Sequence, residues 1–272
     1  MLIFTCACAW AAGAHNASYQ TSDEQGAFPF DSYIKRLQLW DKYNRSSGYV
    51  HHAYSAVSGI GSHSAKNLPF IRWLVTFLRQ NSISSLLEVS CGHWPSGWQR
   101  WVEWPSLDYV GVDMMSEMAE ANSNYLSSIG NGTHGLRTWR FEQGDMVTAE
   151  LPRADVLLTK DTLIHIPNRA IQSFLKHSVL VCPPRYKFVV FVHSYNKEQN
   201  NNDTDPKGTF HYLDMSLPPF SLNVTTPLLW YLVSKHTLDR IVQVYDTSSS
   251  CAAPNARAER GHRSKAEPRE LT

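Results

Sequence analysis

The segment Ile83–Asp113, ISSLLEVSCGHWPSGWQRWVEWPSLDYVGVD, carries the clearest pattern of secondary structure in this chain. An apolar run that ends at Glu88 passes into a turn of small residues, Ser90-Cys91-Gly92, and a second apolar run ends at Asp113. The two apolar runs predict two strands. The turn and the longer segment between them predict a tight loop followed by a helix. Each of the two predicted strands therefore carries a carboxylate at its carboxyl end.

Strands that are joined by a helical crossover run parallel, so their carboxyl ends meet at one edge of the sheet. In open α/β sheets this edge forms the crevice that binds nucleotides and related molecules. We therefore expect Glu88 and Asp113 to line a crevice for a ligand that contains an adenosine group.

Helical and strand patterns alternate on both sides of this stretch. Apolar residues at helical spacing predict an amphipathic helix over Leu68–Gln80, and three tryptophans, Trp98, Trp101 and Trp104, are predicted to face the core. Further helices are expected at Met114–Ser127 and over residues 168–179, and further strands at Thr138–Phe141, Ala154–Thr159, Tyr186–His193, Leu228–Val233 and Leu238–Tyr245. The alternation predicts an α/β fold with a doubly wound, mostly parallel seven-stranded sheet, helices on both faces and an antiparallel edge.

The chain divides into three parts by composition. Residues 1–30 are expected to form a leader and linker, residues 31–246 one folded domain, and residues 247–272, which lose hydrophobic periodicity, a disordered tail. The apolar start Met1–Ala14 lacks a basic segment and is too short to span a bilayer, which takes roughly 20 apolar residues. These features favour a cytoplasmic protein, whereas a signal function of Met1–Ala14 would direct it into the secretory pathway.

Charge and cysteine content narrow the class of ligand. Lys and Arg number 25 against 24 Asp and Glu, so no net positive field attracts a nucleic acid, and a small-molecule acceptor is expected instead. None of the five cysteines has the paired spacing of a zinc site, and we expect no metal.

The ordered motifs resemble those of the class I S-adenosylmethionine-dependent methyltransferases, and more narrowly a group of small, mostly uncharacterised methyltransferase-like proteins. The resemblance covers roughly residues 55–246 and rests on the segments Glu88–Gly92 (EVSCG), Gly111–Asp113 (GVD), Gly144–Met146 (GDM), Leu151–Asp155 (LPRAD), Asp161–Asn168 (DTLIHIPN) and Leu213–Leu222 (LDMSLPPFSL). It implies a Rossmann-like methyltransferase fold, S-adenosyl-L-methionine as cofactor and methyl transfer as the activity.

The resemblance also assigns roles to individual residues. The turn would approach the methionine and ribose groups of the cofactor, Asp113 would accept the ribose hydroxyls, and Asp145 would accept from the adenine amine. The full set of implied cofactor residues is Glu88, Ser90, Cys91, Gly92, Asp113, Met114, Asp145, Met146 and Lys160. Independently of the resemblance, a hydroxyl or protonated amine acceptor needs a base. The candidates on strand ends or neighbouring loops are Asp161, His165, His193 and His211, and Asp161 and His165, which follow the fourth strand, are preferred.

Two other functions stay open at this point. Ser90 stands where the family has its first glycine, and a side chain there could weaken cofactor binding, as in a non-catalytic methyltransferase-like binding module. A nicotinamide-dependent reductase of similar topology is disfavoured because no GxGxxG follows the first strand.

Overall fold

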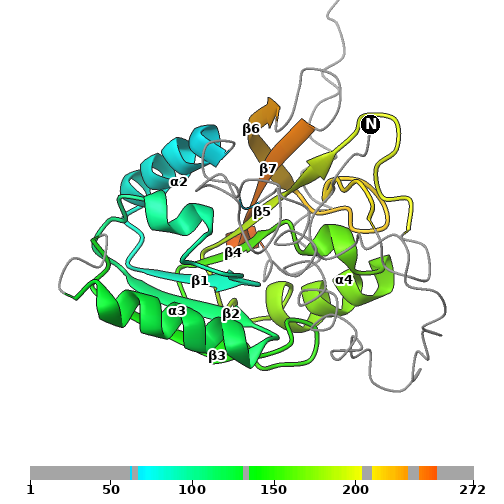
Figure 1. The fold of residues 1–272 in the computed structure, drawn as a ribbon. Coiled ribbons are helices and arrows are strands. Elements are labelled where there is room, and N and C mark those ends of the chain that lie inside the picture. Colours follow the sequence, from blue (N-terminus) through cyan, green and yellow to red (C-terminus); the bar gives the residue numbers. More distant parts are fainter. Residues whose placement is uncertain (1–61, 63–66, 131–134, 204–209, 232–238, 250–272) are drawn as a thin grey trace, which may run out of the picture.

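The computed structural model describes residues 62, 67–130, 135–203, 210–231 and 239–249 of the chain. The leader and nearly all of the predicted tail lie outside the described residues, and Thr247–Ser249 forms the short 3₁₀ helix η6 directly after the last strand. One seven-stranded sheet, in the order β3-β2-β1-β4-β5-β7-β6, runs through the molecule (Figure 1). This architecture confirms the predicted doubly wound α/β sheet.

The strands alternate in direction only at one end of the sheet. β1 to β5 pair in parallel, while β7 pairs antiparallel with both β5 and β6, so the antiparallel edge is also confirmed. The strands are β1 (Ser85–Val89), β2 (Asp108–Asp113), β3 (Thr138–Gln143), β4 (Val156–Lys160), β5 (Phe188–Tyr195), β6 (Val224–Tyr231) and β7 (Asp239–Asp246).

Two apolar clusters pack on opposite faces of the sheet, because successive side chains of a strand alternate between faces. Leu86 belongs to the cluster beneath α2 (Leu68–Gln80) and α3 (Ser116–Ser128), whereas Leu87 belongs to the cluster beneath α4 (Asn168–Phe174) and the π-helical turn η5 (Leu175–Val179). Figure 1 shows α2 beside the β6 end of the sheet and α3 along its β3 end.

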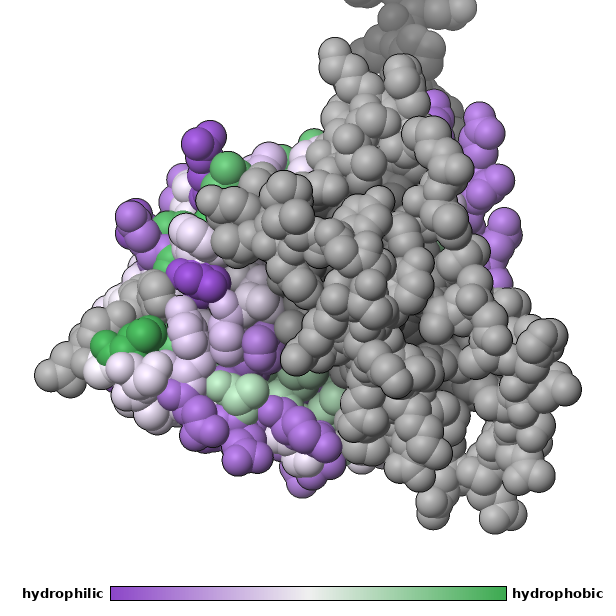
Figure 2. All heavy atoms as spheres, in the orientation of Figure 1, coloured by the Kyte–Doolittle hydropathy of each residue, from purple (hydrophilic) through white to green (hydrophobic). Residues whose placement is uncertain are grey.

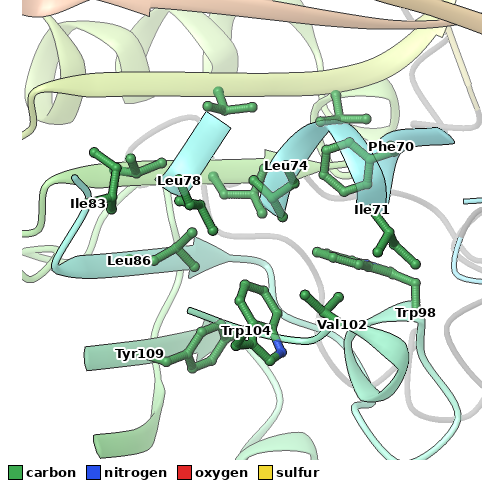
Figure 3. Packing of buried hydrophobic residues seen from close by; sticks show 14 of the residues in the cluster. Phe70, Ile71, Leu74, Leu78, Ile83, Leu86, Trp98, Val102, Trp104 and Tyr109 are labelled. Atoms are coloured by element: carbon green, nitrogen blue, oxygen red, sulfur yellow. The ribbon is translucent and has the colours of Figure 1, made fainter. Parts of the chain in front are cut away.

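Helix α2 has the bounds that its periodicity predicts. Its apolar side chains Phe70, Leu74 and Leu78 are buried and belong to the same apolar cluster as Leu86 of β1, which lies below Leu78 in Figure 3. The outer surface of α3 is polar, and Figure 2 shows the corresponding lower border of the molecule as mostly hydrophilic. No helix in the described part of the chain combines the length and hydropathy that a membrane span requires.

The crossover between β1 and β2 differs from the prediction. The expected helix is absent from this described segment, which contains only η3, a 3₁₀ helix over Trp98–Trp101. Trp98 and Trp104 are buried as predicted, but Trp101 is 48% exposed and lies beneath the guanidinium of Arg100. Bulky rings, with Trp94 stacked on Trp104, fill the space beside the sheet. A proline after Trp94 and glycine at 97 disfavour a regular helix there.

Gly111 in the middle of β2 is expected to tolerate no larger side chain. A Cβ on this residue would lie 2.5 Å from Cδ1 of Phe141 and 2.9 Å from Sγ of Cys91. Overpacking of this kind costs about 1–3 kcal/mol, so Gly111→Ala should lower the free energy of unfolding by that amount in a urea titration. Gly130→Ala is the comparison, since its Cβ would meet nothing within 4 Å and only its positive φ is strained. Equal stability of Gly111→Ala and the wild type would contradict the prediction.

Candidate functional site

The structure brings the predicted site residues to the carboxyl edge of the parallel strands. Glu88, Asp113 and Lys160 lie in the last two residues of β1, β2 and β4, and Asp145 follows the end of β3. The backbone N–H of Gly144 donates to the carbonyl oxygen of Asp113 at 2.8 Å, which holds the loop of Asp145 beside the end of β2. The side chains of these residues, however, differ strongly in their surroundings.

The turn after β1 is held by Asp113. The backbone N–H of Gly92 donates to Oδ2 of Asp113 at 2.9 Å, and that of Cys91 donates to the carbonyl oxygen of Val112 at 3.0 Å. Gly92 has φ +59°, a left-handed conformation that suits glycine, whereas Ser90 is absent from the described residues with positive φ. Ser90 therefore does not need the left-handed backbone conformation that favours glycine.

Asp113 is 6% exposed and is enclosed by backbone donors. Its Oδ1 accepts a hydrogen bond from the backbone N–H of Met115 at 3.2 Å, in addition to the bond from Gly92. Burial raises the pKa of Asp113, although these backbone hydrogen bonds lower it in part. Each carboxylate oxygen can accept more than one hydrogen bond, so the group is both a clamp for the turn and an acceptor at the edge of the sheet.

Glu88 is closed off by side chains from the crossover and from β2. Its carboxylate accepts hydrogen bonds from the hydroxyl of Tyr109 at 2.5 Å and from Nε2 of Gln99 at 3.0 Å. The indole N–H of Trp94 in turn donates to the Tyr109 hydroxyl at 3.0 Å. Burial raises the pKa of Glu88 to about 8, even though Tyr109 and Gln99 lower it. The carboxyl group thus lies in the core beneath the turn.

The loop after β3 contains one capping residue and one core residue. Asp145 is half-buried and its Oδ1 accepts from the backbone N–H of Val147 at 2.9 Å, which caps the following turn. Met146 is buried in the cluster beneath α4, and the carbonyl oxygen of Met114 accepts from Nε2 of Gln143 at 3.2 Å. Asp145 and Met114 lie at the site edge, whereas Met146 packs inward.

A buried ion cluster joins the end of β4 to β7. Nζ of Lys160 and Nη1 of Arg240 each lie 2.5 Å from a carboxylate oxygen of Asp161, and Nη1 of Arg240 also donates to Oγ of Ser194. Burial raises the pKa of Asp161, but the two cations outweigh it and the net pKa lies below the usual value. Sequence reasoning missed Arg240, because no local pattern relates two residues that are 79 positions apart.

Comparisons with known proteins rest on structure alone, since no family model and no curated protein matches the sequence. Magnesium protoporphyrin IX methyltransferase (ChlM) from Synechocystis PCC 6803, solved with bound SAM, aligns over 82% of this chain and 99% of its own, at 11% identity and a TM-score of 0.50. The small RNA methyltransferase HEN1 aligns over 70% of this chain at 12% identity and a TM-score of 0.51, but over only 27% of its own length. The chain has the class I methyltransferase fold. This confirms the fold that the motifs imply.

Within the class I methyltransferase fold, three buried histidines lie near the end of β4. His165 is in the 3₁₀ helix η4 (Leu163–His165), with its ring 6.2 Å from that of Phe210. His211 is bound between two carbonyl oxygens, that of Asn202 at 3.0 Å from Nδ1 and that of Leu163 at 3.1 Å from Nε2. His193 in β5 is 1% exposed, and burial lowers its pKa to about 4.

No group of three or more metal-ligating side chains is found among the residues that the structure describes. The acidic groups at the sheet edge are engaged instead by backbone N–H groups, by Tyr109 and Gln99, or by the cations of the ion cluster. Each of these carboxylates therefore already has a hydrogen-bonding or ionic partner within the described part of the protein.

Proposed function

We propose that the chain is an S-adenosylmethionine-dependent methyltransferase that acts on a small-molecule acceptor. The observation that carries the proposal is the turn Ser90–Gly92, folded against the carboxylate of Asp113 at the carboxyl edge of a methyltransferase sheet. The structural neighbour ChlM was solved with bound SAM, which supports this choice of cofactor. The nearly balanced charge of the chain favours a small acceptor over an RNA.

The residues at the edge fit the parts of such a cofactor. Asp113 would accept from the ribose hydroxyls, since a carboxylate can take two hydrogen bonds from neighbouring hydroxyls. The backbone of Ser90, Cys91 and Gly92 would lie beside the methionine and sugar, and Met114 beside the adenine. Asp145 would accept from the adenine amine. Lys160 would lie near the methionine end, and Glu88 and Met146 would support these groups from the core.

The bound cofactor would supply an electrophilic methyl group, so the protein has to orient the acceptor, exclude water and remove a proton from a hydroxyl or amine acceptor. Of the two candidate bases that follow β4, Asp161 has both oxygens engaged by cations and a pKa below normal, which makes it a weak proton acceptor. We therefore propose that His165 is the base that accepts the proton of the acceptor. Asp161 would instead hold the end of β4.

Calorimetric titration of the full chain with S-adenosylmethionine, S-adenosylhomocysteine and NADH tests the function. Heat with the first two ligands and none with NADH is expected. Heat with NADH alone would support the reductase, and no heat with any ligand would support a binding module without cofactor.

Asp113→Ala is expected to weaken S-adenosylhomocysteine binding about 10- to 100-fold, because hydrogen bonds to a charged group contribute about 1.5–3 kcal/mol. The same calorimetry measures this loss. Asp108→Ala is the matched control, because Asp108 begins the same strand and pairs with Arg137 at the opposite edge of the sheet. An equal loss in both variants would contradict the role of Asp113.

A further inference from the structure

The cysteines of the chain are in different chemical states. Of the two that the structure describes, Cys91 is a buried free thiol, whereas Cys182 is exposed and disulfide-bonded. Within one chain, the partner of Cys182 is therefore one of the three cysteines outside the described residues, which are Cys6, Cys8 and Cys251. The contacts around Cys182 distinguish between these candidates.

Cys182 lies in the segment between η5 and β5, and this segment is bound to the end of β7. The backbone N–H of Thr247 donates to the carbonyl oxygen of Lys187 at 3.1 Å, and the hydroxyl of Thr247 donates to the carbonyl oxygen of Tyr186. The antiparallel pairing of β5 with β7 extends as far as this point. The chain therefore leaves β7 beside the segment that carries Cys182.

The spacing along the chain favours Cys251 as the partner. Cys182 is four positions before Tyr186, and Cys251 is four positions after Thr247. Four residues extend over at most about 14 Å, and the Cα atoms of a disulfide are about 4–7 Å apart, so these two cysteines are within reach of each other. Cys8, the nearer of the two early cysteines, comes 54 positions before residue 62, the first described residue. A longer flexible connection makes pairing with it more costly in conformational entropy.

We propose that Cys182 and Cys251 form a disulfide that fastens the chain after β7 to the segment before β5. The two thiols lose two protons and two electrons as the S–S bond forms, and a disulfide oxidant such as oxidised glutathione takes up both and becomes two thiols. The bond therefore forms where such an oxidant is present, as in the oxidising compartments of the cell.

The disulfide would act on the antiparallel end of the sheet. The loop that it closes, residues 182–251, contains β5, β6 and β7. The hydrogen bonds of Thr247 lie at the amino end of β5, opposite the carboxyl edge where the candidate site lies. The bond thus stabilises the sheet from the edge that holds no cofactor residue.

Peptide mapping of the oxidised protein tests the inference. The full chain is incubated with reduced and oxidised glutathione, its remaining thiols are blocked with N-ethylmaleimide, and the monomer band of a non-reducing gel is digested with trypsin. Cleavage after Lys and Arg places Cys182 in the peptide His177–Arg185 and Cys251 in the peptide Ile241–Arg257. These two peptides should be found linked, and the linked mass should disappear after reduction. Linkage of His177–Arg185 to Met1–Lys35, or the absence of any linked peptide, would overturn the inference.

Thermal unfolding measures what the bond contributes. Reduction with a phosphine should lower the Tm of the wild type by about 5–15 °C, because a disulfide restricts the unfolded chain. Cys251→Ser should have the lower Tm without reductant and show no further change with it. The double variant Cys6→Ser/Cys8→Ser is the matched control, and it should keep both the high Tm and its response to reduction. A wild-type Tm that does not respond to reduction, or a Tm that still responds in Cys251→Ser, would contradict the proposed pairing.

Discussion

Asp161→Asn is expected to lower the free energy of unfolding by about 3–5 kcal/mol, the usual cost of removing one partner from a buried ion pair. The substitution leaves Lys160 and Arg240 buried without their shared carboxylate. Asparagine suits the test because Asp161 has φ +58°, a left-handed conformation that asparagine adopts more readily than most residues. The loss therefore reports the charge and not the backbone.

Urea titration at pH 7 measures this effect, and a double-mutant cycle with Arg240→Met identifies its source. The double variant should be more stable than Asp161→Asn alone, since it removes one of the two buried cations that have lost the carboxylate of Asp161. Arg240→Met alone should be milder, because Asp161 keeps Lys160 as a partner. A cost below about 1 kcal/mol for Asp161→Asn would mean that the cluster contributes no more than an exposed ion pair does.

Glu88→Gln is expected to change the pH dependence of stability. Glu88 has a pKa of about 8 in the folded chain, whereas the ordinary pKa of a glutamate, 4.5, applies in the unfolded chain. Between these two pH values the folded state therefore binds more protons than the unfolded state. The stability that the protonated group contributes is fully present below pH 4.5 and is lost as the pH rises through about 8. One proton corresponds to a slope of about 1.4 kcal/mol per pH unit.

His193 contributes a slope of the opposite sign. Its pKa is lowered from 6.5 to about 4, so its contribution is present above pH 6.5 and is lost as the pH falls through 4. The two slopes oppose each other between about pH 4.5 and 6.5, and Glu88 alone should act between pH 6.5 and 8. The wild type should lose roughly 2 kcal/mol over that interval.

Denaturant titrations at pH 6.5, 7.2 and 8 compare the wild type with two variants. In Glu88→Gln the decline should disappear, because glutamine is a neutral isostere of the protonated acid. Glu117→Gln, at an exposed position in the first turn of α3, should keep the decline of the wild type. A decline that persists in Glu88→Gln would show that another group causes it.

Local sequence patterns were sufficient to predict the sheet and most of its helices. Apolar residues at every second position predict a strand, and apolar residues at helical spacing predict a helix. These patterns predicted α2 with its observed bounds and all seven strands to within a few residues. The glycine turn and the carboxylates at the strand ends also followed from local patterns. Parallel connection of the strands was sufficient to predict that these groups gather at one edge of the sheet.

The surroundings of those groups, in contrast, depend on long-range packing. The tryptophan-rich crossover folds as a short 3₁₀ helix, whose Gln99 reaches Glu88 together with Tyr109 from β2, and so places that carboxyl group in the core. Arg240 reaches Asp161 across 79 residues, through the antiparallel pairing of β7 with β5. Burial and long-range pairing set the charge state and partners of a side chain, and neither is encoded in the residues next to it in the sequence.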